Sequence, residues 1–397
     1  PPVGTPPHGI DGEAVDIRPG SVLSIPFAWG EMDLGAAGTV TDVTPDGRVL
    51  AFGHAMDAIG DTAVPMASGF VHFIQPNIDT SFKLSGSGAM LGTIIRDEHS
   101  AVIGVEQARF KSAPAKITVN LPGQPAREYN YQMLEHPLMS PVIAAILAAN
   151  SIAAEQESPL ESTLTVSARL EFAGDRTIRF TRKLANGSAW DVLYELYGPI
   201  GLMTANGYEA MPLLAMDLTA TIEDTLRVGT VVDARLERPE IAPGDEVGVV
   251  LTIQPYNAPR FTRRIALKTP KNLPEGDYEV ALTDGAGYPW LITASRPHLT
   301  QIESGDDIAE VIRLTTDVRD DAIYMVLFLH EPGLAVGRTE MPRLPGSQAA
   351  LLTAPTSPRS MPFTETIEHM VPMDMVIQGS AGFIVTVTDQ PGKTREE

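Results

Sequence analysis

One histidine and two serines carry side chains that could form a hydrolytic site. His54 follows Gly53 at the end of a predicted strand, and Ser85 and Ser87 lie further along in a Leu-Ser-Gly-Ser-Gly segment. A serine hydroxyl is a poor nucleophile until a nearby imidazole takes its proton. Without such a serine, a lone imidazole in a turn acts only as a hydrogen-bonding group. The chemistry therefore depends on whether the fold brings His54 beside Ser87 or Ser85.

The other polar side chains near His54 do not predict a metal site. Asp57 and Asp61 follow it closely and could orient the imidazole or bind a cation, but one loop without a second set of ligands is a weak metal signal. Gly86 and Gly88 are not followed by the Gly-Lys-Ser/Thr of a phosphate loop. The sequence therefore predicts neither a metal nor a cofactor.

One basic cluster stands out on a chain with a formal net charge of −21. It is interpreted as the solvated face of a hairpin, with docking of an acidic partner surface as the alternative. Its members are Arg260, Arg263, Arg264, Lys268 and Lys271.

The element that must position His54 is a β-hairpin. Residues 38–44 alternate as a strand, Pro45-Asp46-Gly47 supplies a turn, and residues 48–52 form the return strand. Short strands then recur, separated by Gly, Pro or Asp, at 71–74, 81–84, 90–95, 101–105 and 116–120. Strands at this spacing predict a small barrel or sandwich over residues 20–135, after an extended Pro-rich arm at 1–19.

The pattern changes to a mixed α+β segment over residues 136–228. Ser140 before Pro141 predicts a helix to about Glu155, with the serine as its cap. A second helix is predicted after Ser188. Its expected packing face consists of Trp190, Leu193, Leu196, Tyr197 and Ile200.

The remainder is predicted to be β-rich again. Residues 229–300 show the strand spacing of an immunoglobulin-like sandwich, without the cysteines and core tryptophan of antibody domains. Residues 301–397 are predicted to be an α+β region with a polar tail. Within it, Ser304 and Asp307 have the spacing of a capping box.

Composition narrows the function classes. The chain has 397 residues, which predicts several domains, and its 43% hydrophobic content is that of a folded protein. The strong negative charge argues against nucleic acid as a partner. There are no cysteines, so disulfides and thiolate chemistry are excluded. No apolar run is long enough for a membrane span. The chain begins Pro1-Pro2-Val3, which suggests a processed terminus whose leader or anchor was removed.

The hairpin that ends in Gly53-His54 resembles the SpoIVB serine peptidase family. The matching run is Gly-Ala-Ala-Gly-Thr-Val-Thr-Asp-Val-Thr-Pro-Asp-Gly-Arg-Val-Leu-Ala-Phe-Gly-His, residues 35–54, and the likeness covers roughly residues 18–120. It is closest to bacterial envelope proteins that carry this domain followed by β-rich domains. The resemblance implies a chymotrypsin-like barrel in which His54 occupies the position of the general base.

The nucleophile that the resemblance implies is not found. In the family it lies in a Gly-Met-Ser-Gly-Ser-Pro motif well downstream of the histidine, and this chain has no such motif. The nearest imitations are Ser85 and Ser87, which correspond better to a Gly-rich turn. Ser140 lies in Met-Ser-Pro but lacks the glycines that shape an oxyanion hole.

The favoured interpretation is a non-catalytic, extracytoplasmic bacterial protein that binds other proteins of an envelope or extracellular assembly, as a possible homo-oligomer. His54 would then be the relic of a base. One alternative is an active or self-cleaving serine peptidase that uses His54 with Ser87 or Ser85. Another is a glycan- or cell-wall-binding module, although Trp29, Trp190 and Trp290 are scattered in the sequence rather than clustered.

Overall fold

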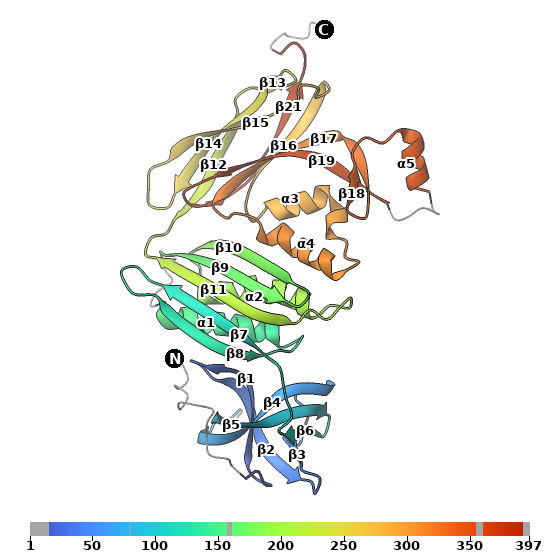
Figure 1. Cartoon of the computed structure of the whole chain (residues 1–397). Coiled ribbons are helices and arrows are strands. Elements are labelled where there is room, and N and C mark those ends of the chain that lie inside the picture. The colour runs from blue at the N-terminus through green and yellow to red at the C-terminus, as the bar shows by residue number, and fades with distance from the viewer. Residues whose placement is uncertain (1–15, 80, 157–160, 355–359, 392–397) are drawn as a thin grey trace. The chain divides into compact units, whose positions relative to one another are not determined.

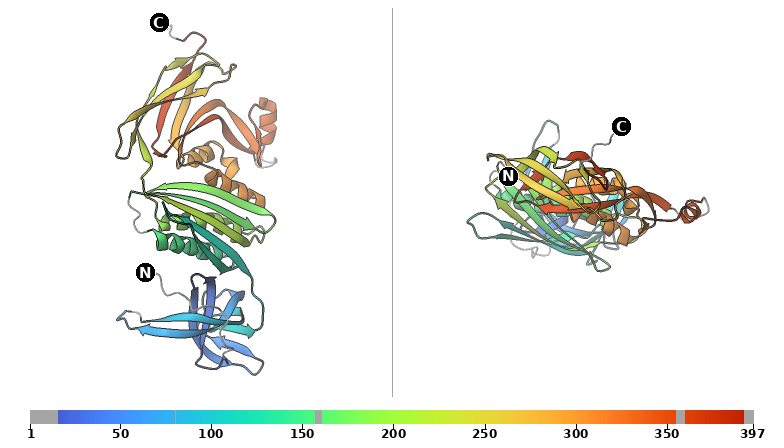
Figure 2. Two further views of the ribbon diagram at one scale, coloured as in Figure 1. Left: turned by 60° about the vertical axis from the view of Figure 1, so that its left-hand side comes forward. Right: turned by 90° about the horizontal axis from the view of Figure 1, so that it is seen from above.

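The computed structural model describes residues 16–79, 81–156, 161–354 and 360–391. This part of the chain is mainly β, with 52% strand and 17% helix, as the sequence predicts (Figures 1 and 2). It divides into two compact units. The first holds the described residues of 1–157 with 168–178 and 188–221, and the second holds the rest. None of the helices in the described ranges has the length and hydropathy that crossing a membrane requires. Most of the predicted Pro-rich arm lies outside the described residues.

The first unit contains a closed six-stranded antiparallel barrel. Its strands are β1 (Val22–Gly30), β2 (Leu34–Val43), β3 (Arg48–Ala51), β4 (Gly60–Gln75), β5 (Phe82–Glu98) and β6 (Ala101–Glu106). They run in the order β1-β2-β3-β6-β5-β4, and β4 returns to β1 through the pairs Leu23↔Ser68 and Ser24↔Ala67. Closure removes the free strand edges that an open sheet would expose.

The hairpin predicted at the start of the barrel is confirmed. β2 pairs with β3, and the turn between them places Gly47 at φ +81°, where a residue without a Cβ is favoured. Thr44 supports the turn, because its Oγ1 donates to Asp46 and accepts from the Arg48 amide at 3.0 Å. The inner side chains of these strands, such as Val40 and Val49, are fully buried. The hairpin therefore forms part of the barrel wall, and His54 follows shortly after its second strand.

The next predicted strands are too short. Residues 71–74 belong to the sixteen-residue β4, and residues 81–84 and 90–95 belong largely to the seventeen-residue β5. The glycines taken as breaks lie inside these strands, because neighbouring strands approach too closely there for a side chain. A Cβ at Gly69 would lie 2.8 Å from Val22, and one at Gly88 would lie 2.5 Å from the hydroxyl oxygen of Ser68.

The sheet continues from the barrel into a mixed α+β layer. Its elements are β7 (Ser112–Asn120), β8 (Arg127–Leu134), α1 (Ser140–Glu155), β9 (Thr163–Phe172), β10 (Arg176–Ala185), α2 (Ala189–Thr204) and β11 (Leu213–Glu223). The strand order is β10-β9-β11-β7-β8-β1, with β11 parallel to β7. α1 and α2 contact each other, and α1 covers β7 and β8 (Figure 1). β1 pairs with β8 over Ala28–Gly30, so this one strand belongs to both the barrel and the layer.

Both helices lie where the sequence predicts, but two details differ. Ser140 is the first residue of α1 rather than its cap, and its Oγ donates to Leu134 O and accepts from the His136 amide. α2 is capped as a box, with the Asp191 carboxylate accepting from the amide and hydroxyl of Ser188. The predicted packing face of α2 is only partly correct, because Leu196 and Ile200 are buried but Trp190 and Tyr197 are exposed. The buried face consists of Ala189, Val192, Leu196, Ile200 and Met203.

The second unit is built around a two-sheet β-sandwich. One sheet contains β15 (Phe261–Lys268), β14 (Glu246–Pro255), β12 (Val228–Leu236) and β20 (Val376–Gln378). The other contains β13 (Glu240–Ile241), β21 (Ala381–Val387), β16 (Gly276–Asp284), β17 (Ala322–Val336), β18 (Thr339–Met341) and β19 (Ser360–Pro372). Buried residues of both sheets, such as Val249 and Val280, form one core. The boundary expected at residue 300 falls between β16 and β17, inside this sandwich.

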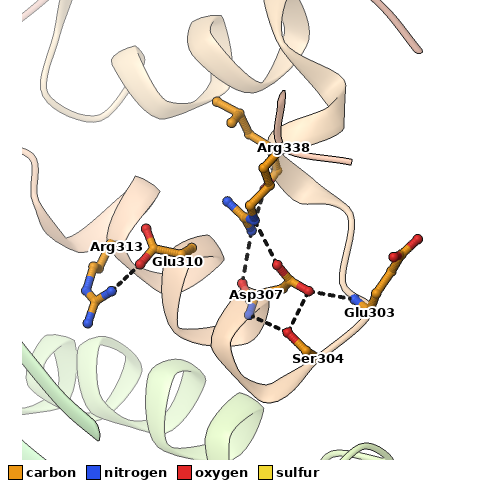
Figure 3. A network of polar contacts seen from close by, with 7 residues as sticks. Glu303, Ser304, Asp307, Glu310, Arg313 and Arg338 are labelled. Atoms are coloured by element: carbon orange, nitrogen blue, oxygen red, sulfur yellow. Dashed lines mark hydrogen bonds and ion pairs between the residues drawn. The ribbon is translucent and has the colours of Figure 1, made fainter. Parts of the chain in front are cut away.

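Helices of the second unit connect β16 to β17 and follow β18. They are α3 (Tyr288–Ser295), the 3-10 helix η1 (Pro297–Thr300), α4 (Gly305–Thr316) and α5 (Gly346–Leu352). The capping box predicted at α4 is confirmed, because the Asp307 amide donates to Ser304 Oγ at 3.2 Å. Asp307 Oδ1 also accepts from Arg338 Nε at 2.8 Å, which ties α4 to the turn after β17 (Figure 3).

Candidate functional site around His54

A sharp backbone corner places His54 after β3. Phe52 and Gly53 both have a φ of +72°, a left-handed conformation that is uncommon for a residue with a side chain. The Phe52 ring covers Gly38 of β2, where a Cβ would come within 2.7 Å of the ring. Its edge also contacts the His54 ring, at 5.9 Å between centroids. The hairpin therefore fixes the corner, and the corner turns the imidazole toward solvent.

The hydrogen bonding of His54 defines its tautomer. Nδ1 lies 2.6 Å from the carbonyl oxygen of Ala55, and a carbonyl only accepts, so Nδ1 carries the proton. Nε2 of the neutral ring then keeps its lone pair, as a general base requires. Within the described ranges, no hydroxyl forms a hydrogen bond with the His54 ring. The imidazole has the tautomer of a base but no serine to activate.

Asp97 holds the loop that follows His54. It ends β5 with only 2% of its surface exposed, and its two carboxylate oxygens accept from the amides of Met56 and Asp57, each at 2.8 Å. Burial alone would raise the pKa of Asp97, but hydrogen bonds from Asp57, Met56, Ile59 and Ala58 outweigh it and lower the pKa. Sequence reasoning missed this residue, because nothing in a strand-end aspartate shows that it will accept amides from a distant loop.

The two candidate serines lie in the middle of β5, away from the His54 loop. Ser87 pairs with Gly69 of β4 and Ser85 with Val71. Ser87 Oγ is 2.7 Å from Ser24 Oγ, and Ser24 is buried on β1. Ten positions along the strand separate Ser87 from Asp97, which corresponds to about 30 Å of extended chain. The structure does not bring Ser87 or Ser85 into hydrogen-bond contact with His54 within the described ranges.

The start of α1 lies close to the His54 loop. The pKa of His136 is lowered mainly by burial, and the nearby charge of Asp57 partly opposes this shift. His136 Nδ1 accepts from the amides of Leu138 and Met139, both at 3.3 Å. This imidazole therefore organises the first turn of α1. Ser140 is also committed to structure, because it is buried and its hydroxyl is bonded to the backbone.

The charge of the basic cluster is partly neutralised by acidic side chains of the same β-sandwich. Arg264 pairs with Glu237 at 2.8 Å and with Glu246 at 3.4 Å, and Arg260 donates to Gln254. The hydrogen bond from Arg264 lowers the pKa of Glu237, and the same bond raises the pKa of Arg264. These contacts fit a solvated hairpin face stabilised by local ion pairs.

A shallow cavity of about 300 Å³ lies in the second unit. Its lining residues come from 225–228, 255–256 and 374–375, and include the apolar Leu226, Pro255 and Met375. Neither His54 nor the candidate serines contribute to it. The cavity is at the small end of the range for ligand sites, and its lining brings no pair of catalytic side chains together.

Comparison of the chain with protein-family models, with curated protein sequences and with solved structures found no match.

Proposed function

We propose that the chain is a non-catalytic relative of chymotrypsin-like serine peptidases that acts as an interaction component of an envelope or extracellular assembly. One observation carries the proposal: His54 Nδ1 is bonded to Ala55 O, and the Ser87 hydroxyl is bonded to Ser24. A working site needs a serine Oγ about 3 Å from an imidazole nitrogen, with two N–H groups converging nearby. His54 has no such neighbour within the described ranges.

The strand order of the barrel supports descent from a peptidase. β1, β2 and β3 follow one another, and β4 returns beside β1, which is a Greek key. A barrel is what the resemblance of residues 18–120 to the SpoIVB family implies. His54 lies between β3 and β4, in a loop secured by the buried Asp97. In this proposal the ancestral active-site loop is kept for a structural role, without catalysis.

The sandwich of the second unit supports a binding role rather than a catalytic one. Two mainly antiparallel sheets that face each other across one core resemble the arrangement of immunoglobulin-like domains, which commonly serve as recognition modules. We propose that this unit is immunoglobulin-like and contributes contacts to other proteins. The extracytoplasmic location rests on the family resemblance alone.

Reaction with a fluorophosphonate probe tests the absence of catalysis. Such a probe labels a serine only when a base has activated it, so the full chain should remain unlabelled. The matched variant His54→Ala should give the same blank result. Labelling of the native chain that disappears in His54→Ala would establish a working nucleophile and refute the proposal.

Co-purification of the native protein tests the proposed assembly. Cross-linking before extraction should recover the chain together with defined protein neighbours from the envelope or extracellular fraction. Recovery only from the cytoplasm, without protein neighbours, would contradict the proposed role. This result is independent of the probe experiment, so catalysis and assembly can fail separately.

A further inference from the structure

The outer face of α2 carries a row of exposed aromatic side chains. Trp190, Tyr194 and Tyr197 are 70%, 76% and 49% exposed. Their spacing of four and three residues places them on one face of the helix, opposite the buried Val192 and Met203. Tyrosine and tryptophan are enriched at the energetically dominant positions of protein interfaces. The row therefore has the composition of a contact surface.

The neighbouring helix extends this apolar surface. A Cβ at Gly201, one turn after Tyr197, would lie 3.9 Å from Pro141 of α1, so the start of α1 borders the aromatic row. Val142 follows and is 42% exposed. No charged side chain occurs in α1 before its last residue, Glu155. Most of α1 is buried, and its exposed positions are Val142, Asn150, Ala153 and Ala154, none of which is charged.

Six side chains define what we call the helix-layer patch: Leu138, Val142, Trp190, Tyr194, Tyr197 and Leu202. Each is at least 42% exposed. Thr204 at the end of α2 donates to Pro137 O at 2.7 Å, which brings Leu138 and Leu202 to the same end of the layer. From the usual size of such side chains, the patch exposes roughly 600 Å². That is the upper end for a monomer surface and close to the roughly 800 Å² per partner of a stable interface.

We propose that the helix-layer patch is the interface between two copies of this chain. A chain of charge −21 repels its own copy, so self-association requires a face with few charges. α1 has no charged residue before Glu155, and α2 has only Asp191 and Glu195. A basic partner would instead need a strongly acidic face. Two-fold stacking of α1 and α2 on their copies would form a four-helix layer between two sheets, which is a self-complementary arrangement. This inference does not depend on the function proposed for the barrel.

Sedimentation equilibrium of the full chain tests the proposal directly. The mass should rise from 42.6 kDa toward twice that value as the concentration of the chain increases. Raising the salt concentration should strengthen the dimer, because salt screens the repulsion between two acidic chains. A chain that stays monomeric at every concentration and salt level refutes the proposal.

Two matched tryptophan variants test the location of the interface. Trp190→Glu should weaken dimerisation at least about tenfold, as expected when a charge replaces a large exposed aromatic residue within an interface. Trp290→Glu is the control, because Trp290 is 73% exposed on α3 and lies outside the patch. Both variants should keep the native circular dichroism spectrum. Dimerisation that is equally strong in both, or lost in both, would overturn the assignment to the helix layer.

The absence of cysteine allows a second readout of the same surface. Asn150→Cys places a single thiol on the exposed side of α1 for a spin label, and a short inter-label distance should appear only under dimerising conditions. Vesicles of neutral phosphatidylcholine address lipid as another occupant of the patch. A blue shift of tryptophan fluorescence on the vesicles that is lost in Trp190→Glu and kept in Trp290→Glu, without dimerisation in solution, would contradict the proposal and favour a lipid surface.

Discussion

Two carboxylates illustrate how single residues connect distant parts of each unit. In the first unit, Asp97 accepts two amides of the His54 loop from a position some forty residues further along the chain. In the second unit, Asp307 joins the first turn of α4 to Arg338. Both carboxylates make charge-assisted hydrogen bonds, with Asp97 buried and Asp307 partly exposed. In both cases the carboxylate supports the backbone and takes part in no catalytic pair.

Asp97→Asn should destabilise the first unit. The asparagine amide turns an N–H₂ group toward one of the two amide donors, so the expected loss is about 2 kcal/mol in the free energy of unfolding. Urea denaturation at pH 7 measures it. Because the pKa of Asp97 is lowered in the folded state, this stabilisation is complete above the unfolded pKa of about 4 and is lost as the pH falls through the folded value.

Asp61→Asn is the matched control for Asp97. Asp61 is exposed and pairs only loosely with Arg96, at 3.5 Å, so its loss should cost less than about 0.5 kcal/mol. Equal stability of Asp97→Asn and the native chain would show that the loop does not depend on this carboxylate.

The Asp307–Arg338 pair should make the second unit sensitive to acid. Hydrogen bonds from Arg338 and Ser304 lower the pKa of Asp307 to about 2. The pair therefore stabilises the fold above about pH 4 and is lost between about pH 4 and pH 2. Since both side chains are partly solvated, the expected contribution at pH 7 is only about 1 kcal/mol. Denaturant unfolding of Asp307→Asn at pH 7 and pH 2 should show the difference from native shrinking in acid.

Arg338→Met completes a double-mutant cycle for this pair. The double variant should lose little more than either single variant, because the two side chains stabilise the same contact. Fully additive losses would mean that the bond in Figure 3 contributes nothing in solution.

At the residue scale, the sequence predicted the Ser304–Asp307 capping box, because both residues lie in one local segment. It could not predict Arg338, because that partner is placed only by the fold.

The barrel strands depend on glycines that have no room for a side chain. Gly92→Ala should cost at least about 2 kcal/mol, because the new methyl group would overlap the backbone of β6 at Val105. Gly198→Ala is the matched control, since nothing lies within 4 Å of its Cβ position in α2. There alanine should be neutral or stabilising by up to about 1 kcal/mol. Thermal unfolding of both variants measures the contrast, and equal melting temperatures would contradict the close approach.

Sequence patterns predicted the kind of element better than its length or its facing. The helix over residues 140–155 was predicted correctly, because Pro141 and a long apolar run mark it locally. The lengths of β4 and β5 were not predicted correctly. A glycine can mark either a turn or a close contact between strands, and the sequence alone does not distinguish the two. The buried face of α2 was also predicted only in part. Trp190 and Tyr197 were assigned to the core for their apolar character, and only the fold shows that they point outward.

At the scale of the whole molecule, net charge should govern solubility. The formal charge of −21 keeps copies apart at pH 7, and the sequence pI is about 4.7. Turbidity of a concentrated solution should therefore peak near pH 4.7 and fall when the pH moves to either side. A solution that stays clear through this range would indicate that short-range contacts, rather than net charge, control association.

The β-rich character was predictable from the sequence, but the sharing of strands was not. Turn chemistry and apolar alternation mark each strand by itself. Pairing between β12 and β20, or between β1 and β8, joins residues about a hundred or more positions apart. No local sequence pattern encodes such a contact. The same holds for the His54 loop, whose amides are bound by Asp97 from a distant part of the chain.

Because β1 belongs to both the barrel and the α+β layer, its two halves pair with their partner strands at different times during synthesis. Leu23 and Ser24 can pair as soon as residues 67–68 have emerged from the ribosome, whereas Ala28–Gly30 must wait for residues 131–133. For that interval the second half of β1 has one unpaired backbone edge, open to mispairing with another nascent chain. A pause in translation within β7 would prolong this vulnerable state, and a pause after β8 would not.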